Sequence, residues 1–322
     1  MRTPPIRRTS VILAVGLVAA ACAPVSAPVS APPSAPASSN GDQNGSLASC
    51  PVFPGDNAWN TDVSSVPVRS DSDAIINQVL ADGPGFLHAD FGGGGTYGIP
   101  YVTVPGTQAK VPINFTSYPG ESDPGPYPVP LGAPIENGSD RHVIAIDRDN
   151  CQLYELYDAT PDGDHWDAGS GATWNLRSDA LRPAGWTSAD AAGLPIFPGL
   201  ARYDEVASGA IHHALRFTVN RTQAGYVSPA RHFASSDTNP DEPAMGMRFR
   251  LKASFDLSPY HGEALVILQA LKTYGMIVAD NGTNFYISGA ADSRWDDADL
   301  NQLKSVPGSA FEVLNTGPVT TG

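Results

Sequence analysis

The sequence predicts a mainly β protein: a single β-sandwich of jelly-roll type, with a few short helices and with long loops at one end. Glycine (32) and proline (30) are numerous among 322 residues, while charged residues make up only 16%. That balance is typical of a loop-rich β protein rather than a helical bundle. Short segments of alternating apolar and polar residues also recur between turn-forming residues. We expect a signal peptide over 1–21, a tether over 22–46 and one β-rich domain over 47–322.

The N-terminal segment has the features of an export signal. Arg2, Arg7 and Arg8 precede an apolar run over 11–21, which is too short for a comfortable membrane span. The run ends in VAAAC at Cys22 and resembles the lipobox of bacterial lipoproteins. The resemblance implies that Cys22 is lipidated after cleavage. Ordinary cleavage after an Ala-x-Ala pattern is the alternative, and Arg7-Arg8 also fit a twin-arginine signal.

The next stretch is rich in Ala, Pro and Ser (APVSAPVSAPPSAPASS). It cannot bury a core, so we expect a disordered tether through residue 46. With Cys22 set aside, Cys50 and Cys151 remain, and an even pair in an exported chain predicts one disulfide, with two free thiols as the alternative. Closing a loop of roughly 100 residues contributes about 4–5 kcal/mol in the chain-entropy model.

The expected elements are short and are bounded by turn-forming residues. Helices are expected over 71–81, 258–275 and 295–304, where polar N-caps or a proline precede apolar residues. Asp149-Asn150 and Asp280-Asn281-Gly282 each predict a hairpin between the strands that flank them. The segment 158–195 is expected to be a long loop. The strands are expected over 99–104, 109–115, 142–147, 152–157, 211–219, 247–255, 276–279, 284–288 and 311–314.

Residues 194–219 form the most concentrated candidate site. Alternation along 211–219 places His212, Ala214, Arg216 and Thr218 on one face of a strand,. Small Ala214 leaves room for a ligand between His212 and Arg216. His213 falls on the opposite, apolar face and is expected to be a hydrogen-bonded core histidine.

Two kinds of glycan chemistry fit the residues around this strand. Asp204 and Glu205 offer one carboxylate of the pair that glycoside hydrolysis requires, with Asp190 or Asp256 as the second; an ion pair between Glu205 and Arg202 is the alternative. His212 and Arg216, with Tyr203, Arg231 and His232, offer the base and the cation of a polysaccharide lyase. Histidine is a common ligand of zinc and copper, so His212 and His232 could form a metal site, but their spacing does not require one. No catalytic fingerprint occurs in the sequence, and no cofactor is expected.

Binding residues are expected outside this strand as well. Trp174 and Trp186 would serve as stacking platforms for sugar rings, or the rings would plug one end of the sandwich. Arg248, Arg250 and Lys252 share one face of 247–255, which predicts a groove for an anionic partner, with a solvated face as the alternative. The net charge of −14 argues against a nucleic-acid partner.

Four runs after Cys50 resemble a group of secreted bacterial proteins: DRHVIAIDRDNCQLYELY, WTSADAAGLPIFPGLARYDEV, HHALRFTV and MRFRLKASFD. The resemblance covers most of the mature chain and implies no particular activity or residue role. From the export signal and the candidate residues together, we expect an exported monomer that is anchored to the cell envelope by lipid or secreted. We expect it to cleave an acidic polysaccharide by hydrolysis or by elimination. A non-catalytic glycan- or envelope-binding lipoprotein is the alternative, and a structural envelope protein is a third class.

Overall fold

The computed structural model describes residues 42–43 and 47–321, which belong to the compact unit Ser38–Gly322. The predicted signal peptide, Cys22 and all of the predicted tether except Asp42–Gln43 lie outside the described residues. Asp42–Gln43 form β1, which pairs antiparallel with Val102 and Thr103. Among the helices of the described residues, none has both the length and the apolar character needed to cross a membrane.

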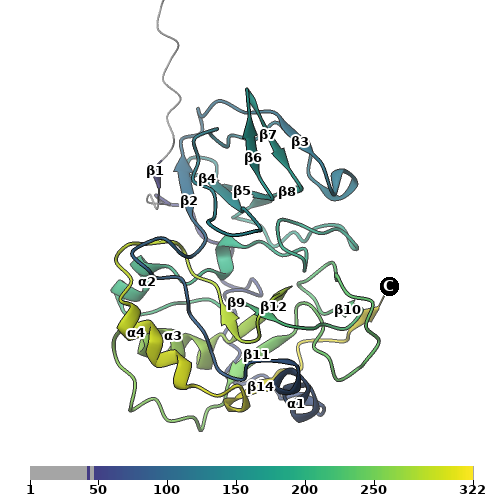
Figure 1. Ribbon diagram of the computed structural model, residues 1–322, viewed down its shortest axis with the longest axis vertical. Helices are drawn as coiled ribbons and strands as arrows, with labels where there is room; N and C mark the ends of the chain where they lie inside the picture. Colours follow the sequence, from purple (N-terminus) through teal and green to yellow (C-terminus); the bar gives the residue numbers. More distant parts are fainter. Residues whose placement is uncertain (1–41, 44–46, 322) are drawn as a thin grey trace, which may run out of the picture. The chain divides into compact units, whose positions relative to one another are not determined.

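The described part of the chain is mainly β, as predicted, with several sheets and a few short helices (Figure 1). Its strands form two sheets of five strands, one of three and one of two. A single jelly-roll sandwich is not confirmed. The sheets are separate and open, and each five-stranded sheet contains a parallel pair of strands, whereas a jelly roll is antiparallel throughout.

The first five-stranded sheet has the order β1-β2-β4-β5-β8. Its hairpin between β4 and β5 was predicted and is confirmed by their antiparallel register. The Oδ1 atom of Asp147 accepts the backbone N–H groups of Asp149 and Asn150, which closes the turn. The strands after β1 are β2 (Tyr101–Val104), β4 (Val143–Asp147), β5 (Gln152–Tyr157) and β8 (Ser170–Asn175).

The prediction of a continuous loop over 158–195 is wrong for its first half. β8 pairs with β5 along its whole length, and the three-stranded sheet β3-β7-β6 takes two strands from the same segment. Gly163, at φ 57°, makes the tight turn between β6 and β7,. These strands are β3 (Ile113–Phe115), β6 (Thr160–Asp162) and β7 (His165–Ala168).

The second five-stranded sheet has the order β13-β9-β12-β11-β14. The predicted hairpin between 276–279 and 284–288 is wrong, because β12 and β13 lie on opposite sides of β9 and both pair with it. β9 also begins later than predicted, and the N–H of Ala214 donates to Trp59 instead of a strand. The predicted edge strand β14 is confirmed. The strands are β9 (Leu215–Val219), β11 (Arg248–Leu251), β12 (Met276–Asn281), β13 (Tyr286–Ile287) and β14 (Phe311–Val313).

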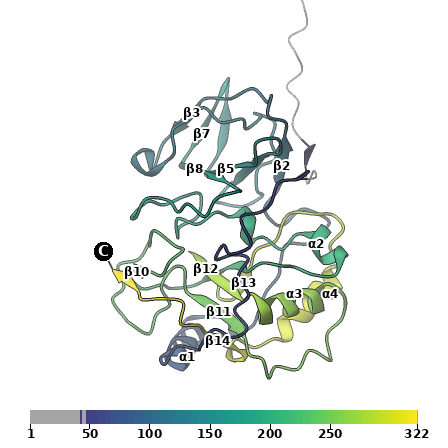
Figure 2. The same ribbon diagram turned by 180° about the vertical axis from the view of Figure 1, so that it is seen from behind.

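The predicted helices form, with one shifted start. Asp296 caps α4 through the N–H of Ala298 at 2.8 Å. The helix predicted over 258–275 begins at Gly262 rather than near Ser258, and the Ser258 hydroxyl donates to Asp256 instead. α3 and α4 lie side by side (Figures 1 and 2). The α-helices are α1 (Ser72–Asp82), α2 (Tyr203–Ser208), α3 (Gly262–Thr273) and α4 (Asp297–Asn301). The remaining elements are β10 (Gly225–Tyr226), β15 (Thr320–Thr321), η1 (Pro119–Glu121), η2 (Phe197–Gly199), η3 (Gln302–Ser305) and η4 (Gly308–Ala310).

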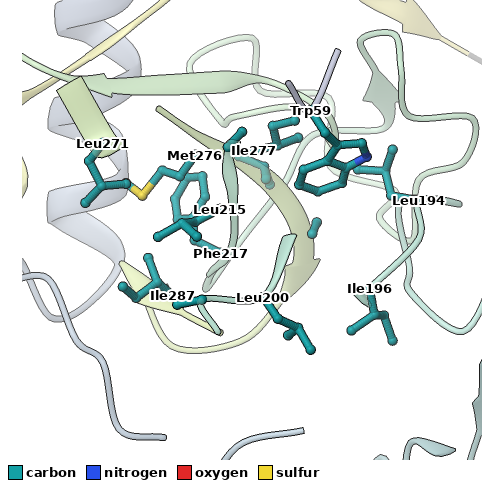
Figure 3. Packing of buried hydrophobic residues seen from close by; sticks show 14 of the residues in the cluster. Trp59, Leu194, Ile196, Leu200, Leu215, Phe217, Leu271, Met276, Ile277 and Ile287 are labelled. Atoms are coloured by element: carbon teal, nitrogen blue, oxygen red, sulfur yellow. The ribbon is translucent and has the colours of Figure 1, made fainter. Parts of the chain in front are cut away.

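One apolar core includes residues of both five-stranded sheets. Figure 3 shows its centre, where Leu215 and Phe217 of β9 lie near Met276 and Ile277 of β12. Complete burial of a side chain of this size contributes about 1.5–3 kcal/mol. The predicted disulfide is also confirmed: Cys50 and Cys151 are bonded, with Cα atoms 5.3 Å apart.

Candidate functional site

Two adjoining hollows of about 180 and 260 Å³ share Asp140, Asp280 and Asn281 in their walls. We call the two together the carboxylate cleft, because carboxylates dominate its ionisable lining. That lining comprises Asp90, Glu136, Asp140, Asp190 and Asp280, together with Arg216, His142 and His232.

Segments that are distant in sequence supply the cleft. Arg216 lies on β9, and Asp280 lies near the carboxyl end of β12, the parallel neighbour of β9. Glu136 and His142 precede β4 of the first sheet, and Asp190 lies between β8 and η2. Tyr157 of β5 and Ser170 of β8 also line the cleft, so both five-stranded sheets contribute residues to the lining.

Arg216 is held by protein acceptors. Its Nε and Nη2 atoms lie 3.1 and 3.0 Å from Oδ2 of Asp190, and its Nη1 donates to the Ser288 hydroxyl at 2.6 Å. Both charged side chains are buried. Burial raises the pKa of Asp190 to about 7 against the opposing charge of Arg216,. Arg216 was expected to face a substrate uronate, but its side chain is buried and each of its three nitrogens already has a protein oxygen within hydrogen-bonding distance.

His142 and Glu136 form the second charged pair. The Nδ1 atom of His142 lies 2.6 Å from Glu136 Oε2, and its Nε2 lies 2.9 Å from the carbonyl oxygen of Ala189. Burial opposes both charges, but the hydrogen bond and mutual attraction outweigh it. They raise the pKa of His142 and lower that of Glu136,. The imidazolium thus donates from both nitrogens to acceptors.

Asp280 and Glu136 are carboxyl groups of opposite character in one cleft. Burial raises the pKa of Asp280 against the opposing charge of Arg216, whose Nη2 lies 4.0 Å away. Glu136 is instead kept ionised by His142. The two side chains are 25% and 21% exposed, so solvent reaches both. A pair of carboxyl groups with pKa values shifted apart is the arrangement that acid–base catalysis uses.

His232, which the sequence suggested as a catalytic residue, lines the smaller hollow. Its Nδ1 lies 2.7 Å from the carbonyl oxygen of Ala191. A carbonyl only accepts, so Nδ1 carries the proton and Nε2 is the ring nitrogen available as a base in the neutral imidazole.

Tyr203, Asp204 and Glu205 lie on α2 and do not line the cleft. Glu205 binds Arg202 and lies 3.1 Å from Nε2 of His213, so the alternative ion pair forms. Burial opposes ionisation, but these two partners lower the pKa of Glu205 to about 2. Asp204 binds Arg294 at 2.8 Å, and that guanidinium lies over the Tyr203 ring. His213 is a buried, hydrogen-bonded histidine, as expected.

His212 and Arg216 are not brought together. The prediction of a shared strand face is wrong, because β9 starts at Leu215 and His212 lies before it, exposed. Its Nδ1 is 3.5 Å from the hydroxyl of Tyr274. The second carboxylate candidate, Asp256, is also exposed and bonds only Ser258 within the described residues.

The described residues contain one group with metal-ligand geometry: Asp162, His165 and Asp167 on β6 and β7. It includes neither His212 nor His232, the pair considered from the sequence.

Trp174 and Trp186 flank one guanidinium. The Cζ of Arg182 lies 5.6 and 5.7 Å from the two ring centroids, and Arg231 donates to the Arg182 carbonyl. Trp174 is buried in the wall of a separate cavity of about 250 Å³. Trp186 is half-buried. These residues lie outside the lining of the carboxylate cleft.

The expected cationic groove on 247–255 does not form. Arg248 and Arg250 are buried. Arg248 donates to the carbonyls of Ala58 and Tyr274, and Arg250 donates to Glu312 and to the carbonyl of Val63. Lys252 donates to the Ser309 carbonyl. The polar face of β11 is covered by segments that are distant in sequence, so it is not open to solvent.

Sequence reasoning missed Glu136, Asp140 and His142 and treated Asp280 as a turn residue. Glu136 directly follows a proline-rich stretch, and no periodic pattern marks it. A usable signal was present in Asp280-Asn281, two polar residues directly after the apolar run MIVA. Such residues at a strand end commonly face a site.

The chain was compared with protein-family models, with curated proteins and with solved structures, and none of the three comparisons gives a match. The cleft geometry is therefore the basis for assigning a class of function.

Proposed function

We propose that this protein is an exported, envelope-tethered, glycan-active protein that hydrolyses polysaccharide in the carboxylate cleft. One observation carries the proposal: two part-exposed carboxyl groups, Asp280 and Glu136, line the same hollow and have pKa values shifted in opposite directions. Glycoside hydrolases use one protonated and one ionised carboxyl group in this way.

Each group has a defined role in this mechanism. Asp280, whose pKa is raised by burial, donates a proton to the leaving glycosidic oxygen,. Glu136, ionised beside the His142 imidazolium, acts as the base or nucleophile on the sugar,. His142 touches no substrate and acts by holding Glu136 in place and charged.

The tyrosine rings that line the cleft are evidence in favour of a sugar ligand. Tyr118 and Tyr157 line the smaller hollow and Tyr286 lines the larger one. An aromatic ring packs on the apolar face of a sugar while its hydroxyl remains available to polar groups. Export is supported by the disulfide, because such bonds persist in oxidising compartments,. The lipid anchor at Cys22 remains part of the proposal from the sequence alone.

Elimination is the second candidate, because His232 presents a ring nitrogen as a base in the same cleft. Lyase chemistry also needs a cation on the substrate carboxylate, and the Arg216 guanidinium is buried with its charge balanced by Asp190. This difference favours hydrolysis over elimination.

The test is a polysaccharide screen of the mature chain that measures new reducing ends and the ultraviolet absorbance of unsaturated products. We expect reducing ends without absorbance. Asp280→Asn and Glu136→Gln should each lower kcat by about 10²–10⁴-fold. Asp256→Asn is the matched control, because it changes an exposed carboxylate elsewhere.

Two other results of this screen would contradict hydrolysis and favour a different function. Unsaturated products would replace hydrolysis with elimination. Glycan binding without either product would support the non-catalytic binding lipoprotein.

A further inference from the structure

The charge of the cleft is unbalanced. Three of its carboxylates have cationic partners among the described residues: Asp190 with Arg216, Glu136 with His142, and Asp90 with Lys304 at 2.7 Å. All three nitrogens of Arg216 and both ring nitrogens of His142 lie within hydrogen-bonding distance of protein oxygens. The charges of these two cations are therefore balanced within the protein.

Two acidic side chains remain, the carboxylate of Asp140 and the protonated carboxyl of Asp280, and both line both hollows. Asp140 is exposed and has no cationic partner among the described residues; its Oδ1 accepts the Ser139 hydroxyl at 3.1 Å. Asp280 lies 4.0 Å from Arg216 Nη2, which is 3.0 Å from Asp190. The charge of Asp140 at the junction of the hollows is thus not balanced by an ion pair among the described residues.

We infer that the carboxylate cleft selects glycans that carry free amino groups, such as polymers of 2-amino-2-deoxy sugars, over uronate-bearing glycans. A sugar ammonium at the junction would meet the negative charge of Asp140, whereas a uronate there would meet a charge of its own sign. This inference rests on the proposed hydrolase function and names its substrate class. It replaces the acidic glycan expected from the sequence, whose main basis was the cationic face of 247–255.

The net charge of the whole chain favours the same class of ligand. This charge of −14 attracts cationic polymers and repels polyuronates, and a low-dielectric hollow concentrates that field. Sugar ammonium groups are also strong hydrogen-bond donors to carboxylates. Tyr118, Tyr157 and Tyr286 provide the surfaces on which the sugar rings would pack,.

The test compares polymers that differ in charge and not in backbone. The mature chain is given β-1,4-linked glucosamine and α-1,4-linked galactosamine polymers, each also in fully N-acetylated form, together with polygalacturonate and alginate. Binding and release of reducing ends are measured at low and high salt. We expect a deacetylated polymer to be preferred over its N-acetylated form by about tenfold, with polyuronates weakest. The preference should shrink in high salt because the charges lie near solvent.

The variant Asp140→Asn distinguishes the contribution of the cleft to this preference from the contribution of the protein's net charge. It should lower the affinity for the amino polymer. The ratio of this affinity to the affinity for the N-acetylated form should fall by about fivefold. Asp164→Asn removes the same charge from a fully exposed side chain outside the cleft, and it should leave that ratio unchanged.

The outcomes distinguish this inference from the proposed function. If a polyuronate or an N-acetylated polymer is cleaved best, the inference is overturned and hydrolysis stands. The same holds if Asp164→Asn narrows the ratio as much as Asp140→Asn does. If no polymer in the panel is bound or cleaved, the proposed function falls and the inference falls with it.

Discussion

At pH 8, where Asp190 is ionised despite its raised pKa of about 7, removing its charge should destabilise the protein by about 1.5–3 kcal/mol, the contribution of hydrogen bonds to a charged group. The Asp190 side chain is 0% exposed and that of Arg216 is 5% exposed. Asp190 Oδ2 accepts from two nitrogens of Arg216. Asp280, at 4.0 Å, is too distant to replace those hydrogen bonds,. Asp190→Asn therefore leaves a buried guanidinium without its counter-charge.

Urea unfolding of Asp190→Asn against the unmodified protein measures this cost. Asp71→Asn is the control, because Asp71 also binds an arginine at 2.8 Å but is 41% exposed; it should cost less than about 1 kcal/mol. The double variant Asp190→Leu with Arg216→Met removes both charges and should be much closer to the unmodified protein. An Asp190→Asn cost as small as that of the control would refute the reasoning and would return Arg216 to the list of substrate-binding candidates.

Three further predictions concern the disulfide, an ion pair and the catalytic carboxyls. Replacing Cys50 and Cys151 by serine opens a loop with a sequence separation of 101 and should cost about 4–5 kcal/mol; thermal unfolding with and without reductant measures it, and an unchanged melting temperature would contradict it. The lowered pKa of Glu205, about 2 against an ordinary 4.5, means that its stabilisation is fully present above pH 4.5 and is lost as the pH falls towards 2. The destabilisation caused by Glu205→Gln in urea should shrink in the same range, and a pH-independent difference would count against the ion pair. Hydrolysis should begin as the pH rises through the lowered pKa of Glu136 and decline as it rises through the raised pKa of Asp280,. The profile of kcat/KM should thus be a bell with an acidic optimum, and activity that keeps rising into alkaline pH would exclude these roles.

Features decided by neighbouring residues were predictable from the sequence. The turn at Asp149-Asn150 forms because Asp147 lies two and three residues before the N–H groups that it accepts,. Asp296 caps α4 by the same short-range chemistry,. The disulfide followed from the number of cysteines in a chain with a predicted export signal,. In each case the interacting groups are close in sequence or are limited to one pairing.

Strand partners were not predictable in this way. Asp280-Asn281-Gly282 has the composition of a hairpin turn, yet β12 and β13 each pair with β9 instead of with each other. β9 is far from both in sequence, so local propensity contains no information about it. The pairing is stabilised by burial of Phe217 against residues of several distant segments, which outweighs the local turn preference.

The site was mislocated for a related reason. Alternation along a strand tells which side chains share a face, but it does not tell whether solvent or another segment covers that face. Arg216, Arg248 and Arg250 all fell on polar faces, and all three are buried. Burying an arginine requires acceptors, so each marks a place where a distant segment supplies oxygen atoms. For Arg248 and Arg250 these are backbone carbonyls and Glu312, and the hollow that Arg248 lines contains no carboxylate. For Arg216 they are Asp190 and Ser288 beside a hollow that several carboxylates line, which is why this arginine, and not the other two, leads to the candidate site.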